Sequence, residues 1–125
     1  MKLSQRIIRT LCTEVNHHKS FTIGKKDIDV YADLTGDKNP IHIEESVVHG
    51  THLLGLVSSV VAQNYPRSKL VDLQAKFASP CLANTSVEVE VSMPSKTRKL
   101  TSALFSIKDA GTKTILVSGQ VKILL

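Results

Sequence analysis

The sequence predicts an α+β fold in which an antiparallel β-sheet wraps around one long central helix. Residues 50–64 are apolar on nearly every side, a pattern that favours a buried helix. After residue 66 the apolar residues begin to alternate with polar ones, which is typical of half-buried strands. The chain has 125 residues, 42% of them hydrophobic, which suits a single globular domain with its own core.

Residues 1–20 form a basic N-terminal segment with four basic residues and a single acidic one, Glu14. Helical spacing would place Lys2, Arg6 and Arg9 on one stripe, opposite apolar residues, as in a mitochondrial presequence. The alternative is a basic helix or strand that belongs to the fold. We therefore divide the chain into residues 1–20 and one domain, residues 21–125, and expect a mitochondrial location, or otherwise a cytoplasmic or peroxisomal one.

A short helix is predicted over residues 25–35, where apolar residues recur at helical spacing. Asp27 stands near its start and Gly36 follows it as a stop. Next comes the turn 37–40, in which Pro40 disfavours helical backbone at the residue before it. The helix should therefore deliver the chain into this turn, with His42 just beyond it.

Four strands are predicted after the central helix. Their expected faces are formed by apolar residues spaced two apart, and a less regular strand covers 98–107. Turn-forming residues at 83–85, 94–96 and 109–111 connect the strands. The members of the three regular faces are Val71, Leu73, Ala75 and Phe77; Val87, Val89 and Val91; and Ile115, Val117, Val121, Ile123 and Leu125.

Several functional classes conflict with the composition. Cys12 and Cys81 form no Cys-x-x-Cys pair, and His17 and His18 lack a nearby acidic or cysteine partner in the sequence, so no disulfide scaffold or metal site is expected. No apolar run approaches the ~20 residues of a membrane span. The net charge of +5 comes mainly from residues 1–20, and the few aromatics are scattered, so nucleic-acid binding is only a weak alternative.

The turn places a carboxylate and an imidazole five positions apart, at Asp37 and His42. A carboxylate beside a histidine can take a proton from a water molecule and deliver a proton elsewhere near neutral pH. The alternative is purely structural, with Asp37 capping the local backbone and His42 packed inside. The spacing alone leaves both interpretations open.

The second feature is Val48-His49-Gly50 at the start of the central helix. Unpaired N–H groups in the first turn of a helix carry partial positive charge and could hold a developing oxyanion. Equally, Gly50 could be a simple N-cap with His49 as its neighbour. His52 is interpreted as a packed helix histidine and not as a ligand.

Taken together, Gly36-Asp37-x-Asn39-Pro40-x-His42, then Val48-His49-Gly50, then Phe77-x-x-Pro80 resembles the MaoC-like, (R)-specific enoyl-thioester hydratase family, which has the hot-dog fold. The resemblance extends from about residue 21 to residue 125. Within the family the chain is similar to the mitochondrial branch that dehydrates 3-hydroxyacyl thioesters in fatty-acid synthesis.

The resemblance implies roles for individual residues. Asp37 and His42 match the catalytic dyad, and Asn39 matches the position that helps to order the water and the dyad. The backbone N–H of Gly50 matches the donor that polarises the thioester carbonyl. Candidates for the acyl pocket, equally well explained as core, lie one helix face beyond this donor: Leu53, Leu54, Val57 and Val60.

The activity implied by the resemblance is reversible hydration of trans-2-enoyl thioesters, with dehydration of (R)-3-hydroxyacyl thioesters as the reverse reaction. It needs no cofactor and no metal. The implied partners are an acyl-CoA or acyl-carrier-protein substrate and a second copy of the chain in a homodimer.

The sequence departs from the family pattern between His42 and His49, where only six residues stand in place of a short helix and a longer loop. This shortening could move His42 relative to Gly50 or open the pocket. Two alternatives therefore stay open beside the hydratase: a thioesterase on the same fold, and a non-catalytic relative that binds acyl thioesters or acts as a scaffold.

Overall fold

The computed structural model describes residues 14–125. The stripe of basic residues that suggested a presequence lies in residues 1–13, outside the described part. Five strands and three helices follow in the order β1 (Glu14–Thr22), α2 (Lys25–Thr35), α3 (Pro40–Ile43), α4 (Gly50–Asn64), β2 (Lys69–Phe77), β3 (Ser86–Pro94), β4 (Leu100–Asp109) and β5 (Ile115–Leu124).

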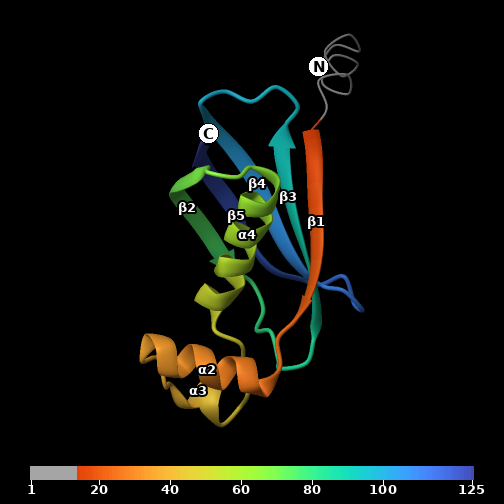
Figure 1. Cartoon of the computed structure of the whole chain (residues 1–125). Helices are drawn as coiled ribbons and strands as arrows, with labels where there is room; N and C mark the ends of the chain where they lie inside the picture. The colour runs from red at the N-terminus through yellow and green to blue at the C-terminus, as the bar shows by residue number, and fades with distance from the viewer. Residues whose placement is uncertain (1–13) are drawn as a thin grey trace.

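The five strands form one antiparallel sheet in the order β1-β3-β4-β5-β2. Helix α4 lies along one face of this sheet, and α2 and α3 sit together at one end of the molecule (Figure 1). The predicted α+β class and the sheet wrapped around a long helix are confirmed. The connection from α2 through α3 to α4 carries the residues with candidate chemistry.

Strand β1 pairs with β3 along its whole length, from Glu14 opposite Pro94 to Thr22 opposite Ser86. It runs through the boundary placed after residue 20, so residues 14–20 belong to the sheet.

The two histidines of β1 contact side chains that their spacing in the sequence did not predict. His17 Nε2 lies 2.9 Å from the Tyr65 hydroxyl, and His18 Nδ1 lies 3.6 Å from a Glu90 carboxylate oxygen on β3.

The core lies between α4 and the sheet face that it covers. Strand β3 alternates as predicted, with Val87, Val89 and Val91 buried. Helix α4 buries only one face, because Gly55 and Ser58 are exposed on another. The expectation that this helix is buried on all sides is therefore wrong for the single chain. The residues of α4 that are fully buried are Leu53, Val57, Val60 and Val61.

Two strand faces differ from the strict alternation. The register between β2 and β5 shifts between Leu70 and Asp72, so Val71 leaves the predicted face and is 52% exposed. A second shift, between Ile107 and Lys108 of β4, lies opposite the start of β5, where Ile115 is exposed and Leu116 is buried. An extra residue at a bulge moves the side chains on one side of it to the opposite face of the sheet. A strict two-residue pattern in the sequence does not predict this change.

The ends of α2 agree with the predicted signals. Asp27 accepts a hydrogen bond from the backbone N–H of Gly24 at 2.9 Å, which closes the first turn. Gly36 ends the helix in the left-handed conformation at φ 80°. Asn84 also adopts a left-handed backbone, with φ 66°, in the turn before β3.

Candidate active site

The turn after α2 fixes the backbone that carries Asp37 and His42. Asp37 Oδ1 accepts the Asn39 backbone N–H at 3.3 Å, and Asn39 Oδ1 accepts the Ile41 N–H at 3.2 Å. With Pro40 at its first position, α3 therefore begins immediately after the turn. The short helix brings the His42 ring back towards the carboxylate of Asp37.

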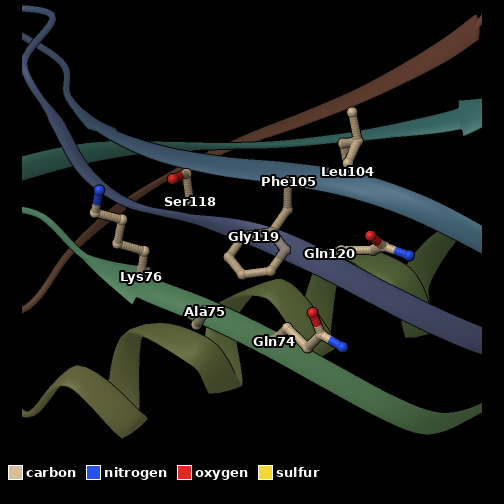
Figure 2. A pocket seen from close by; sticks show the side chains of 8 residues that line it. All are labelled: Gln74, Ala75, Lys76, Leu104, Phe105, Ser118, Gly119 and Gln120. Atoms are coloured by element: carbon tan, nitrogen blue, oxygen red, sulfur yellow. The ribbon is translucent and has the colours of Figure 1, made fainter.

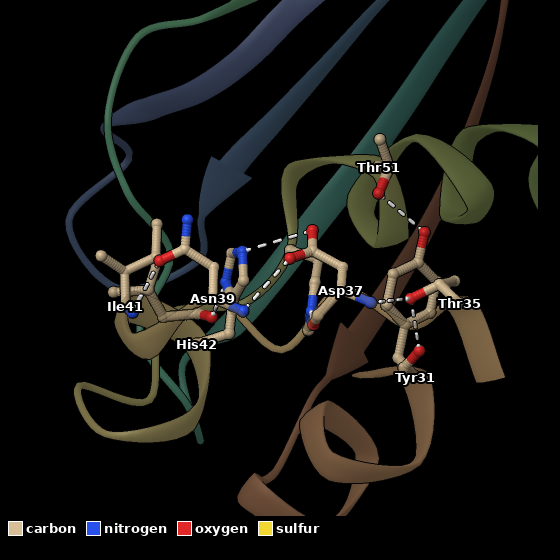
Figure 3. Close-up of polar contacts among 9 residues, drawn as sticks. Tyr31, Thr35, Asp37, Asn39, Ile41, His42 and Thr51 are labelled. Atoms are coloured by element: carbon tan, nitrogen blue, oxygen red, sulfur yellow. Dashed lines mark hydrogen bonds and ion pairs between the residues drawn. The ribbon is translucent and has the colours of Figure 1, made fainter. Parts of the chain in front are cut away.

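The two side chains face each other (Figure 3): His42 Nε2 lies 3.7 Å from Asp37 Oδ2. The other ring nitrogen, Nδ1, lies 2.8 Å from the Val47 carbonyl oxygen, which can only accept a hydrogen bond, so Nδ1 carries the proton. In the neutral ring this leaves the Nε2 lone pair directed at the carboxylate. His42 is buried whereas Asp37 is exposed, so the pair is reached from solvent on the Asp37 side.

His49 joins the pair from the start of α4. Its Nε2–H donates to the backbone carbonyl of Asp37 at 2.9 Å, and its ring stacks on the His42 ring with centroids 3.7 Å apart. The six residues between the two histidines are therefore enough to bring their rings into contact. Gly50 follows His49 directly and begins α4.

Asp37, His42, His49 and Gly50 all line one cavity of about 410 Å³. A Cβ at Gly50 would lie 2.5 Å from the Phe77 ring at the end of β2, so glycine allows this ring to pack against the start of α4. In the first turn of α4 the N–H groups of His52 and Leu53 donate to the His49 carbonyl. Those of Gly50 and Thr51 have no backbone acceptor among residues 14–125, so this end of the helix is suited to a partial negative charge.

The other predicted site residues are distributed between the cavity and the core. Leu53 lines the cavity, whereas Val57 and Val60 are fully buried in the core and Leu54 packs against it half-buried. Asn39 caps α3 through its side-chain oxygen. Of the four acyl-pocket candidates, the structure thus brings only Leu53 to the dyad.

Sequence reasoning missed several groups at the site. The Val47 carbonyl that orients His42 has no signal in the sequence, because any residue could supply it. Tyr31 of α2 packs on His49 with ring centroids 4.7 Å apart, and its hydroxyl lies 2.7 Å from Thr51 Oγ1. Cys81 is buried and lines the cavity, and this burial raises the pKa of its thiol, with a smaller contribution from the Asp109 carboxylate.

Among residues 14–125, one group of side chains could hold a metal ion: Asp37, His42 and His49 each offer a ligand atom within 4.8 Å of the others. His42 Nδ1 and His49 Nε2 are already engaged with backbone carbonyls. The atoms left over are the Asp37 carboxylate, His42 Nε2 and His49 Nδ1. The side chains that could hold a metal ion are thus the dyad, Asp37 and His42, together with His49.

A larger hollow, about 580 Å³, lies over β2, β4 and β5 (Figure 2). The Phe105 ring lies over Gly119 at its centre, and Gln74, Lys76 and Gln120 surround it. Lys76 is the only titratable side chain among its lining residues. Because the hollow lacks a carboxylate or imidazole, the dyad cavity is the better candidate for catalysis.

The chain is thus a hot-dog domain in which an aspartate–histidine pair lies beside the start of the central helix. The family described as "MaoC like domain" matches residues 7–113, and the chain belongs to this family. It is a hydratase/dehydratase family, as the resemblance in the sequence indicated.

Individual known proteins are also similar to this chain in sequence or in structure. A 3-hydroxybutyryl-CoA dehydratase of Methylorubrum extorquens is 31% identical over 81 residues, covering 55% of this chain and 52% of that protein. The chain thus spans about half the length of this curated relative. The (R)-hydratase from A. caviae involved in PHA biosynthesis has a TM-score of 0.82 and 21% identity over 90% of this chain and 96% of its own.

R-hydratase PhaJ1 from Pseudomonas aeruginosa is similar to the same extent, with a TM-score of 0.81 and 18% identity over 90% of this chain and 80% of its own. At these identities the two structures establish the hot-dog fold. Among the helices of residues 14–125, none has the length and apolar character to cross a membrane.

Proposed function

We propose that the protein catalyses the reversible hydration of trans-2-enoyl thioesters to (R)-3-hydroxyacyl thioesters. The observation that carries this proposal is the approach of His42 Nε2 to Asp37 Oδ2, 3.7 Å apart, in a cavity that also contains the start of α4. Base, acid and oxyanion donor are the three groups that addition of water to an enoyl thioester requires.

The tautomer of His42 suits it to act as the base. Because Nδ1–H is held by the Val47 carbonyl, Nε2 is free to accept a proton from a water molecule bound between it and Asp37. As the water oxygen bonds to C3, the C2–C3 π electrons shift towards the thioester carbonyl oxygen. The imidazolium that forms is stabilised by the neighbouring carboxylate.

The carbonyl oxygen gains negative charge in this step, and the backbone N–H of Gly50 is proposed to donate a hydrogen bond to it. The imidazolium of His42 then gives its proton to C2, which completes the addition of one water molecule and returns the dyad to its starting state. Dehydration follows the same steps in reverse. None of these steps requires a metal or a redox cofactor.

The partners are also part of the proposal. The substrate is an acyl thioester of coenzyme A or of acyl carrier protein, and the protein acts as a homodimer. Strand β2 has only β5 as a strand partner among residues 14–125, which leaves an edge to which a second copy could add. Light scattering should give about 27 kDa, twice the 13.7 kDa of one chain; a value near 13.7 kDa would exclude the homodimer.

The decisive experiment measures hydration of crotonyl-CoA, a short trans-2-enoyl thioester, with the product's chirality assigned and free thiol measured in parallel. Asp37→Asn and His42→Gln should each lower kcat by roughly 10²- to 10⁴-fold, because the first removes the carboxylate that binds the water and stabilises the imidazolium and the second removes the base. Asp33→Asn is the matched control: this exposed carboxylate pairs with Lys38 outside the cavity and should leave kcat unchanged.

Three outcomes separate the alternatives. Formation of the (R)-3-hydroxy product without free thiol supports the hydratase. Free thiol with no hydration would instead assign a thioesterase. Binding of the acyl thioester without turnover, on both CoA and carrier-protein substrates, would identify a non-catalytic relative.

A further inference from the structure

His49 contacts both halves of the dyad. Through its ring nitrogen Nε2 it donates to the main-chain carbonyl of Asp37 at 2.9 Å, and through its ring face it stacks on His42 at 3.7 Å and 20°. No other side chain in residues 14–125 has a hydrogen bond or ring contact to both residues. The position of one dyad member relative to the other therefore depends on this ring.

The His49 ring is held from behind as well. It is only 1% exposed, and Tyr31 of α2 packs on it with ring centroids 4.7 Å apart. Tyr31 is fixed in turn by stacking on His52, at 4.6 Å, and by the hydrogen bond to Thr51. The rings thus form a stack from α3 to α4, and His49 has little freedom to rotate.

The engaged polar atom of the His49 side chain is Nε2, and it bonds to the backbone of a dyad residue, Asp37. His49 occupies the N-cap position of α4, yet its side chain makes no capping hydrogen bond. Its Nδ1 is buried and has no hydrogen-bond partner among residues 14–125. Burying an unpaired polar atom is unfavourable, so among the polar contacts of the ring it is the hydrogen bond from Nε2 to Asp37 that favours histidine at this position.

We propose that His49 is a positioning residue that holds the Asp37 backbone by its Nε2–H and the His42 ring by its face. The inference rests on the proposed hydratase reaction and deepens it. It assigns the two contacts different tasks: the hydrogen bond places the carboxylate, and the stack keeps the imidazole in the orientation in which Nδ1 meets the Val47 carbonyl.

Two substitutions separate these tasks. His49→Phe keeps an aromatic ring against His42 and removes the N–H donor, whereas His49→Gln keeps an N–H donor at a similar distance from the backbone and removes the ring. Misplacing a reacting group by about 1 Å costs on the order of 10² in rate. We therefore expect His49→Phe to lower kcat for crotonyl-CoA about 100-fold, with KM within about threefold of the wild type.

The stability of the variants distinguishes positioning from packing. His49→Phe removes the unpaired Nδ1 but also the hydrogen bond to the Asp37 carbonyl, and these effects oppose each other, so the variant should unfold within a few degrees of the wild type while its kcat falls. The matched control is His52→Phe, the same change one turn later on α4, outside the dyad cavity but also against Tyr31. It should retain wild-type kcat.

A readout independent of turnover tests the stack. The ¹⁵N chemical shifts of His42 should report a proton on Nδ1 in the wild type and in His49→Phe, and a mixture of tautomers in His49→Gln. The proposal is overturned if His49→Phe keeps wild-type kcat, if its loss is confined to KM, or if His42 keeps a single tautomer in His49→Gln. A wild-type protein without hydratase turnover refutes the proposed function, and the shifts then still decide whether His49 positions His42.

Discussion

At the scale of single residues, the histidines of this chain have different environments that their spacing does not reveal. His42 and His49 each donate to a backbone carbonyl, which fixes one tautomer in the neutral ring. His52 instead stacks flat on Tyr31, and its buried Nδ1 has no hydrogen-bond partner in the described part of the chain. Imidazoles in one region can therefore serve proton transfer, positioning and packing.

His52 should make the stability of the protein depend on pH. Burial lowers its pKa below 6.5, opposed by the Asp27 carboxylate and assisted by His49. The unfolded chain therefore takes up a proton near pH 6.5 that the folded protein does not, and the stabilisation present above about pH 6.5 is lost as the pH falls below it.

Urea unfolding at pH 7.5 and pH 5.5 checks this expectation. The wild type should lose more stability between these values than His52→Phe, which keeps an aromatic ring against Tyr31 and cannot be protonated. An equal loss in both proteins would show that His52 does not contribute to the pH dependence.

At the scale of elements, the sheet depends on a glycine in β5. Gly119 lies opposite both Phe105 of β4 and Ala75 of β2. A Cβ at this position would overlap the Gln74 backbone oxygen and approach the Phe105 ring to 2.8 Å. Because the oxygen belongs to the backbone of β2, only a displacement of that strand can relieve the overlap.

Gly119→Ala should therefore destabilise the protein by about 2 kcal/mol or more, as overpacking of a fixed backbone does. Gly55→Ala is the matched control. Its Cβ would meet nothing within 4 Å, and alanine in an exposed helix position should stabilise by roughly 0.5–1 kcal/mol. Urea unfolding of the two variants should give opposite signs, and destabilisation by both would contradict this interpretation.

At the scale of the whole molecule, the structure makes residues 14–20 part of the sheet. A chain that begins at Glu14 keeps every described element, whereas a chain that begins at Phe21 loses seven of the nine positions at which β1 pairs with β3. We therefore expect the longer form to unfold at a clearly higher urea concentration than the shorter one. If a leader is removed, cleavage before Glu14 is compatible with the sheet.

Comparison of the two truncated proteins by urea unfolding checks this expectation, with the full chain as the control. Equal midpoints for the two truncated forms would show that β1 contributes little. N-terminal sequencing of the native protein would test the expected presequence, and a protein that retains Met1 would contradict it.

The spacing of Asp37 and His42 left a catalytic and a structural interpretation open, and only the resemblance to a known family favoured the catalytic one. The α+β class and the extent of the helices at residues 25–35 and 50–64 were predictable from the sequence. These features depend on local signals: helical spacing, Gly36 as a stop, and a turn fixed by Asn39 and Pro40. Such features can be predicted from the sequence because they depend on residues that are close together in the chain.

Which side chains complete the site became visible only in the folded protein. Tyr31, Phe77 and Cys81 come from three separate segments and meet around His49 and Gly50 only after folding. The bulge that exposes Val71, and the core position of Val57 and Val60, likewise depend on strands and helices distant in sequence. Such contacts are set by how elements pack, and a spacing within one segment carries no information about them.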